Sequence, residues 1–206
     1  MKTLLVNGSP HAKGCTYTAL CEVAAALERE GIETEIFQVG TKPISGCLGC
    51  GACLKTGRCV IADTVNEFLD KAEKADAFVF GSPVHFASAS GMLTSFMDRA
   101  FYGRGNLFAY KPAAAVMSCR RGGATATFEQ INKYFTISNM PIVGSQYWNM
   151  VHGNTPEEVK QDGEGMQTMR TLGLNMAWLM KSIQAGKEAG LELPQREAKI
   201  NTNFIR

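Results

Sequence analysis

Short apolar runs alternate along the chain with segments in which apolar residues recur every three or four positions. The runs are TLLVNG (3–8), ETEIFQV (33–39), ADAFVFGSPV (75–84), PAAAVMSC (112–119) and PIVGSQYW (141–148). The helical spacing follows at Leu20, Val23, Ala24 and Leu27 before Gly31, at Val65, Phe68, Leu69 and Ala72, at Leu93, Phe96, Met97 and Ala100, and at Phe128, Ile131 and Phe135. This alternation predicts an α/β fold with a doubly wound, five-stranded parallel sheet and helices on both faces.

The same pattern predicts where the regular elements begin and end. Thr64 and Glu67 have the spacing of a capping box ahead of the second helix. A final helix is expected from about Glu164 to Ala189, with Met166, Met169 and Met176 in its core or dimer stripe. Residues 40–60 show no periodicity and predict an ordered insertion, while the polar tail at 190–206 predicts an exposed arm or a clasp on a partner. We expect one domain over residues 1–206.

Composition and charge narrow the function by exclusion. The 206 residues are 45% hydrophobic and 19% charged, with a formal net charge of +2 and no block of like charge. That balance favours neither nucleic acid nor an anionic membrane as a partner. The apolar run at the start is too short for a signal peptide, and no run has membrane-spanning length, so we expect a cytoplasmic protein. In that reducing compartment, clustered cysteines favour metal or redox chemistry over structural disulfides.

Ligands of doubly wound sheets bind beyond the carboxyl ends of the strands, which draws attention to three loops. The first, NGSPHAKGCT, opens a helix, where backbone N–H groups and the helix dipole favour a phosphate. Ser9, Thr16 and Tyr17 offer hydroxyl groups, and His11 and Lys13 offer positive charge. The loop matches neither the Walker pattern nor Gly-x-Gly-x-x-Gly, which argues against ATP and against a dinucleotide at this turn. The alternative is a tight turn with a capped helix.

The second loop, GSPVHFASASG, is unusually apolar for this edge of a sheet. Pro83, Val84, His85 and Phe86 can form a flat wall for a planar heteroaromatic ring. The alternative is a loop packed against another subunit, and a dimer would allow both.

The third loop, SCRRGGATAT, combines Arg120 and Arg121 with Gly122 and Gly123. Guanidinium groups or backbone N–H groups there would stabilise the negative charge that a flavin gains at N1 and its C2 carbonyl on reduction. The alternative is a solvated arginine pair on the surface.

Together, GSPHAKGCT, FGSPVHFASASGMLTSFMDR and SCRRGGATAT resemble the NADPH-dependent FMN reductase and iron-sulfur flavoprotein group of flavodoxin-like proteins. The resemblance runs from the first strand to the last helix and implies strand order 2-1-3-4-5, bound FMN, and a homodimer or homotetramer. It implies a phosphate site at Ser9, His11, Cys15, Thr16 and Tyr17. It implies a ring site at Pro83, Val84, His85, Phe86, Ser118, Arg120, Arg121, Gly122 and Gly123.

Four of the seven cysteines, Cys47, Cys50, Cys53 and Cys59, lie within the insertion. Four thiolates suit a [4Fe-4S] cluster or a zinc ion, and two successive two-residue gaps are more typical of the cluster. Gly46, Gly49, Gly51 and Gly57 would let the backbone bend around a metal. Free thiols or reversible disulfides remain an alternative. In the iron-sulfur flavoproteins a matching segment binds [4Fe-4S], which the resemblance extends to these four residues. Cys21, on the first helix, is expected in the core.

The resulting hypothesis is an FMN-dependent NAD(P)H oxidoreductase that passes electrons from flavin N5 to a quinone-like, flavin or other small acceptor. No side chain is needed as acid or base, because the cofactor carries the chemistry. One alternative is an iron-sulfur flavoprotein electron carrier that receives electrons from ferredoxin. A second is an FMN-binding thiol redox sensor. No Ser-His-Asp order, His-Glu-x-x-His or paired-carboxylate motif supports hydrolysis.

Overall fold

The computed structural model describes residues 1–198 and 200–202 and contains the expected parallel sheet. Its strands are β1 (Lys2–Asn7), β2 (Glu33–Gln38), β3 (Ala77–His85), β4 (Ser88–Ala89), β5 (Ala113–Cys119) and β6 (Met150–His152). The five parallel strands are ordered β2-β1-β3-β5-β6, and β4 pairs antiparallel with the end of β3. Without that short hairpin strand the order is the predicted 2-1-3-4-5, so the flavodoxin-like α/β fold is confirmed.

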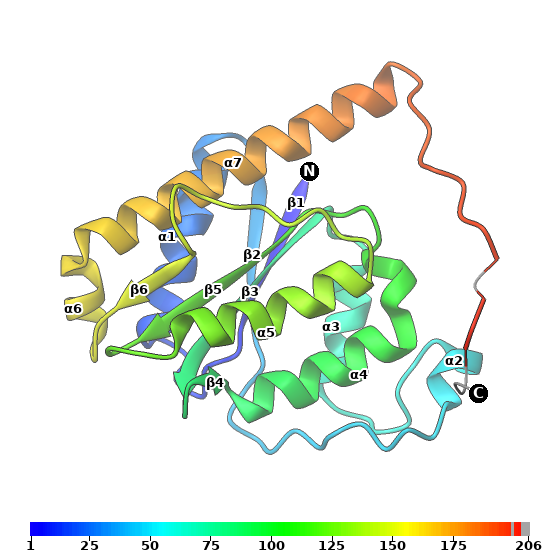
Figure 1. Ribbon diagram of the computed structural model, residues 1–206, viewed down its shortest axis with the longest axis horizontal. Helices are drawn as coiled ribbons and strands as arrows, with labels where there is room; N and C mark the ends of the chain where they lie inside the picture. Colours follow the sequence, from blue (N-terminus) through cyan, green and yellow to red (C-terminus); the bar gives the residue numbers. More distant parts are fainter. Residues whose placement is uncertain (199, 203–206) are drawn as a thin grey trace.

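Helices cover both faces of the sheet (Figure 1). They are α1 (Cys15–Arg29), α2 (Ala52–Thr56), α3 (Thr64–Ala72), α4 (Gly91–Phe108), α5 (Ala124–Ile137), α6 (Pro156–Gln161) and α7 (Gly163–Glu188). Buried apolar side chains of α1 and α7 form one core with the sheet, and those of α3, α4 and α5 form the other. The second core contains a network of phenylalanine rings with Phe68 near its centre. Because helices cover both faces of the sheet, the carboxyl edge is the place where a ligand can bind.

The fifth strand was predicted at the wrong place. The predicted run at 141–148 makes one parallel bridge, Ala113 to Ile142, and the paired strand is β6 at Met150–His152. Between them the chain leaves the sheet, because the Ser145 hydroxyl shares its one proton between the Tyr147 carbonyl and Asn149 Oδ1 and accepts from the Tyr147 N–H. These local hydrogen bonds offer the backbone an alternative to the ladder.

Two smaller expectations also need correction, and the structure adds a short helix to the predicted insertion. The N-cap of α3 is Asp63, whose carboxylate accepts from the Val65 N–H, and not Thr64 as the capping-box pattern predicted. The insertion contains the short helix α2, although its sequence has no periodicity. Cys21 is only half-buried rather than in the core. Its thiol is a hydrogen-bond partner of the Tyr17 hydroxyl one helical turn earlier.

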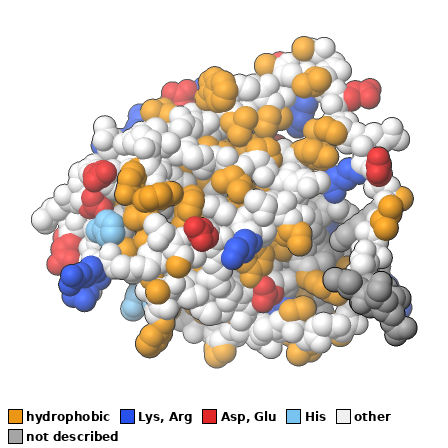
Figure 2. Space-filling view, viewed as in Figure 1, with side chains coloured by type: hydrophobic (Ala, Val, Ile, Leu, Met, Phe, Trp, Pro, Cys, Tyr) orange, Lys and Arg blue, Asp and Glu red, His pale blue; other side chains and the backbone are white. Residues whose placement is uncertain are grey.

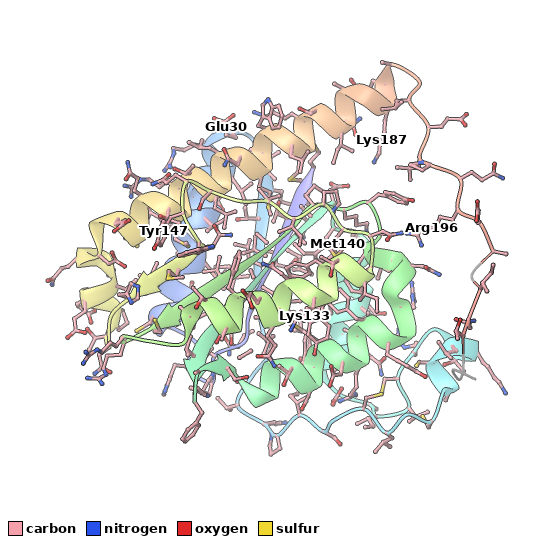
Figure 3. The ribbon with its side chains drawn as sticks, in the orientation of Figure 1. Glu30, Lys133, Met140, Tyr147, Lys187 and Arg196 are labelled. Carbon is pink, nitrogen blue, oxygen red and sulfur yellow. The ribbon has the colours of Figure 1, made fainter. Side chains whose placement is uncertain are left out.

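The C-terminal tail is an exposed arm over its described residues, 190–198 and 200–202; the rest of the predicted tail, Lys199 and 203–206, lies outside the described chain. Arg196 turns back toward the end of α4 (Figure 3). It donates to the Asn106 side chain at 3.2 Å, and its guanidinium lies 5.0 Å from the centre of the Tyr110 ring. The arm is therefore fastened to its own chain at α4.

Apolar side chains are spread among charged ones over the face seen in Figure 2. Large exposed examples on α7 and before β6 include Trp148, Leu174 and Trp178. The expected homodimer or homotetramer stays a prediction. Within residues 1–198 and 200–202, no helix combines the length and apolar character needed to cross a membrane.

Candidate functional site

The three loops singled out in the sequence meet at the carboxyl edge of the sheet. The Gly8 N–H donates to the Gly81 carbonyl at 2.9 Å, which joins the end of β1 to the middle of β3, where the second loop sequence begins. The hydroxyls of Thr16 and Ser118, from the first and third loops, lie 2.8 Å apart in a buried hydrogen bond. A Cβ on Gly123 would lie 2.5 Å from the Cα of Ala87, so the second and third loops also touch. The fold thus makes one continuous site from segments about 110 residues apart in sequence.

A small network of amides fixes the shape of the first loop. The buried Asn7 side chain donates to the His11 carbonyl at 3.3 Å and to Gln38 Oε1 at 2.6 Å. Gln38 in turn donates to the Ser9 carbonyl at 2.7 Å. Ser9 is buried, and its Oγ accepts the His11 N–H at 3.1 Å. The loop is therefore preorganised by residues of β1 and β2, two of which the sequence did not single out.

The N-terminus of α1 fits an anion. Its N-cap is Gly14, which has no side chain to cap the free N–H groups of the first turn. Those amides belong to Cys15, Thr16 and Tyr17, and a fifteen-residue helix adds the positive end of its dipole. The first turn contains no acidic residue that would compete with a phosphate. His11 and Lys13 are exposed beside it.

The predicted phosphate ligands are not equally placed. Ser9 and Thr16 are buried and already hydrogen-bonded within the loops. The Cys15 thiol donates to the Gly153 carbonyl at 3.8 Å, and burial raises its pKa. The hydrogen bond to Cys21 raises the pKa of Tyr17, so that phenol is engaged along its own helix. The assignment of these residues to a phosphate stays a prediction, with the backbone amides as the free donors.

The second loop is a tight hairpin with an unusual turn. Phe86 and Ala87, its two central residues, have φ of 50° and 56°, the left-handed conformation that a two-residue turn needs and that non-glycine residues rarely adopt. Gln130 of α5 holds the returning strand by accepting from the Ser88 hydroxyl at 2.8 Å and the Ala89 N–H at 2.9 Å. The clamp keeps the turn in a strained conformation, as is common at functional sites.

This hairpin only partly forms the predicted apolar wall. Pro83 and Val84 are half-buried beside the third loop, and Pro83 pairs with Ser118 in the sheet. His85 and Phe86 are exposed, and the Phe86 ring projects fully into solvent. The placement of a flavin ring against these four residues stays a prediction.

The third loop leaves its cationic part exposed. Ser118 is buried at the end of β5, whereas Arg120, Arg121 and Gly122 are exposed. Gly123 has φ of 90° and begins α5 as its N-cap, without a side-chain cap. The loop therefore offers two exposed guanidinium groups beside backbone N–H groups without a side-chain cap, which suits an anionic edge of a ring.

Cys119 and His152, which were not assigned to the site from the sequence, also lie at the carboxyl edge of the sheet. The buried Cys119 thiol lies 3.4 Å from Nδ1 of His152, at the end of β6. Burial raises the pKa of Cys119, which disfavours its thiolate. The His152 N–H donates to Asp162 Oδ2 at 2.7 Å, while the other oxygen of Asp162 caps α7.

The cysteine segment lies against α4, the helix that begins directly after the hairpin (Figure 1). A Cβ on Gly103 would lie 2.7 Å from the Cβ of Cys53, so this contact requires glycine. Arg104 donates to the Gly57 carbonyl at 3.3 Å and forms a salt bridge at 2.6 Å with Glu73, the C-cap of α3. One helix therefore joins the three loops at the sheet edge to the cysteines.

Arg99 of the same helix is buried, with 2% of its surface exposed, and every N–H of its guanidinium has an acceptor. Two go to the carboxylate of Asp63, at 2.6 and 2.8 Å. Two go to the carbonyls of Ser45 and Ile61, at 3.3 and 3.1 Å, and the Nε–H goes to the Cys59 sulfur at 3.2 Å. Burial works to lower the pKa of Arg99, but the hydrogen bonds to Asp63 and Cys59 outweigh it and raise the pKa. The guanidinium is therefore charged.

Asn66 of α3 holds the backbone of Cys59 from the other side. Its Oδ1 accepts the Cys59 N–H at 3.0 Å, and its Nδ2 donates to the carbonyls of Cys59 at 3.0 Å and Ile61 at 3.2 Å. Cys59 is thus fixed by two helices, through its main chain and its sulfur.

Cys47, Cys50, Cys53 and Cys59 line one pocket, as four ligands of one group must. Burial, followed by the neighbouring thiols, raises the pKa of Cys53. Gly49, Gly51 and Gly57 take left-handed φ values of 63°, 67° and 72°, which lets the chain turn around the pocket.

The sulfurs are not gathered around a single point. Among the described residues, no three Cys, His, Asp or Glu side chains stand close enough to hold a single metal ion. The four thiols still supply the donor set that a zinc ion or a [4Fe-4S] cluster requires. The two successive two-residue gaps between Cys47, Cys50 and Cys53, which are typical of the cluster, favour [4Fe-4S] over zinc.

Comparison with known proteins agrees with this geometry. The family model for NADPH-dependent FMN reductase matches residues 1–155, which include the three loops and the four cysteines. The chain belongs to this family. It is therefore a redox protein of an FMN-binding family.

Relatives and structures add two findings. An iron-sulfur flavoprotein of Methanocaldococcus jannaschii is 35% identical over 195 residues, covering 89% of this chain and 100% of the relative. An iron-sulfur flavoprotein of Methanosarcina thermophila is 28% identical over 193 residues, covering 91% and 100%. The solved structure of an archaeal flavodoxin has a TM-score of 0.61 at 15% identity, covering 88% of this chain and 99% of that chain. The last comparison confirms the fold, and the first two relate the chain to iron-sulfur flavoproteins.

Sequence reasoning missed the residues that hold the cysteines. Asp63 and Asn66 belong to no motif, and Arg99, the last residue of the stretch FGSPVHFASASGMLTSFMDR, was assigned no role. Their contacts join separate elements of the chain. One signal was present, because Arg99 stands one helical turn after Phe96 and next to Ala100 in the apolar stripe of α4. A charged residue there needs a buried partner.

Proposed function

We propose that this chain is an iron-sulfur flavoprotein that holds FMN at the three loops and a [4Fe-4S] cluster at the four cysteines, and that it moves electrons to a small acceptor. The observation that carries the proposal is the meeting of four cysteines at one pocket, with the Cys59 sulfur held by a buried cation. The curated relatives, named iron-sulfur flavoproteins, support it over most of their length.

The chain's own residues would divide the work at the flavin. The first turn of α1 would bind the phosphate through its free amides, and Ser9 and Asn7 would keep that loop in shape. Arg120, Arg121 and the amides at Gly122 and Gly123 would stabilise negative charge on the ring. Bound FMN supplies the hydride and electron chemistry at N5, so no protein acid or base is required.

The electron donor we favour is a small acidic carrier such as ferredoxin. Residues 40–60 contain three cationic side chains, Lys42, Lys55 and Arg58, and no Asp or Glu. All three are exposed, although Arg58 is paired with Asp70 of α3. A cationic surface around the cysteines would steer an acidic partner to the point where electrons enter.

Direct reduction by NAD(P)H, followed by transfer to a quinone-like or flavin acceptor, is the second candidate function. The match to the NADPH-dependent FMN reductase model supports it, as does the exposure of the third loop to a second ligand. A thiol redox sensor would use the same cysteines without a cluster.

The deciding experiment is anaerobic purification with FMN, iron and acid-labile sulfide counted per chain, followed by reduction with NADPH and then with reduced ferredoxin. We expect one FMN, four irons and four sulfides, with rapid reduction by ferredoxin. Cys50→Ser should lose the cluster absorption and keep FMN, while Cys21→Ser, a matched thiol outside the pocket, should keep both. Flavin reduced quickly by NADPH in both variants would favour the reductase. Protein that binds no FMN on titration would refute the proposal, and FMN without iron would leave the sensor.

A further inference from the structure

The hydrogen bond from Arg99 to Cys59 has a consequence beyond holding the loop. We propose that Arg99 is a positioning residue that directs its Nε–H at the Cys59 sulfur and thereby raises the reduction potential of the cluster. The inference rests on the proposed function, because it takes Cys59 to be a cluster ligand. Hydrogen bonds to the sulfurs are among the features by which a protein sets the potential of such clusters.

The direction of the donor is fixed by the rest of the guanidinium. The planar group makes four other hydrogen bonds, two to Asp63 and one each to the carbonyls of Ser45 and Ile61. Turning the Nε–H away from Cys59 would break these bonds inside a buried site, where lost partners are costly. The sulfur therefore faces a donor that cannot swing away.

The sign of the effect follows from charge. Reduction adds one electron, and an N–H aimed at a ligand sulfur stabilises the more negative state. Burial of Arg99 removes water that would otherwise screen this interaction. Asp63 neutralises much of the guanidinium charge, so the hydrogen bond and the nearby carboxylate act in opposite directions on the cluster.

The effect should be concentrated at one ligand. Cys47 and Cys50 are exposed, and in the part of the chain that the structure describes no side-chain donor reaches the sulfurs of Cys47, Cys50 or Cys53. Cys59 is the ligand with a charged donor on its sulfur and an amide clamp on its backbone. The iron bound there would differ electronically from the others.

The test compares three variants of the anaerobic holoprotein by redox titration of the cluster, followed by EPR, with the FMN titrated separately by absorption. Arg99→Lys keeps a cation for Asp63 but cannot also aim an Nε–H at Cys59. Asp63→Asn keeps an N-cap for α3 and removes the carboxylate charge. Arg104→Gln is the matched control, since Arg104 lies on the same helix and contacts the same segment through the Gly57 carbonyl without reaching a sulfur.

For Arg99→Lys we expect the equilibrium constant for cluster reduction to fall about tenfold, which is about 59 mV for a one-electron couple. Asp63→Asn should shift it in the opposite direction, and Arg104→Gln should leave it unchanged. The iron–sulfur(Cys) vibrations in resonance Raman spectra should shift in Arg99→Lys and should not shift in Arg104→Gln. Opposite shifts at Arg99 and Asp63 are not expected of residues that merely stabilise the loop.

An unchanged potential in Arg99→Lys would overturn the inference and leave the proposed function standing. So would a folded Arg99→Lys protein that keeps FMN but cannot retain its cluster, because Arg99 would then be a structural support. If Arg99→Lys does not fold, Asp63→Asn decides, and an unchanged or lowered potential there overturns the inference. Wild-type protein without iron and sulfide would refute the cluster of the proposed function and this inference with it.

Discussion

Replacing Gly123 by alanine should push apart the two loops that we assign to the flavin ring. Gly123 has φ of 90°, and a Cβ there would lie 2.5 Å from the Cα of Ala87 and 2.9 Å from Cγ1 of Val84. The left-handed backbone costs an alanine about 1–2 kcal/mol, and overpacking adds about 1–3 kcal/mol. The nearest atom is hairpin backbone held by Gln130, so it cannot move cheaply. We expect unfolding to become easier by about 2–5 kcal/mol.

Gly122→Ala is the matched control, because its Cβ would meet no atom within 4 Å and its φ is not positive. That neighbour should change stability by no more than about 0.5 kcal/mol. Urea unfolding followed by circular dichroism gives both free energies, and FMN titration by fluorescence gives the affinities. Gly123→Ala should weaken FMN binding beyond any effect of Gly122→Ala. Equal stability of the two variants would refute the reasoning from close approach, and unequal stability with equal FMN affinity would refute the assignment of these loops to the ring.

Three further outcomes can be measured on the same protein. Asn66→Ala removes three hydrogen bonds to the backbone of Cys59 and Ile61 and should lower the free energy of unfolding, measured by urea titration, by about 2–3 kcal/mol. No loss of stability would show that these hydrogen bonds are redundant. Burial, and then the hydrogen bond to Asp98, raises the pKa of Tyr134, so the contribution of its phenol to stability should be complete below pH 10 and fall as the pH rises further. A difference in the free energy of unfolding between wild type and Tyr134→Phe that stays constant above pH 10 would contradict this. Charge reversal at Lys42 and Lys55 should slow electron entry from reduced ferredoxin and weaken its salt dependence, and unchanged stopped-flow rates would exclude this surface.

Much of the architecture could be predicted because its signals are local. The runs at β1, β3 and β5 are bounded by turn residues, and the apolar spacing of α7 places that helix within one residue at each end. The fifth strand failed for a physical reason. Gly144 and the Ser145 turn interrupt the predicted run at 141–148, so the run keeps one bridge to β5, and the paired strand forms beyond it at Met150–His152.

The candidate site likewise has a part that could be predicted from the sequence and a part that could not. Loops after strands are fixed by fold topology, so the meeting of Thr16, Ser118 and the hairpin could be anticipated. The network of Asn7 with Gln38 and the buried pair of Arg99 with Asp63 could not, because each joins elements 31 to 36 residues apart through side chains of common types. Such pairs follow no rule of sequence spacing, so their partners can be identified only from the three-dimensional structure.

The attachment of the cysteine segment to α4 affects how this protein can change during evolution. An insertion is usually regarded as removable without harm to the host fold. Here its loss would leave Arg99 without two of its acceptors and would uncover Gly103, both in the helix that follows the β3–β4 hairpin. A descendant that gave up its four cysteines would therefore need compensating changes at positions 63, 99 and 103. The segment and the helix should be inherited together, and residues 59 and 99 should covary among relatives.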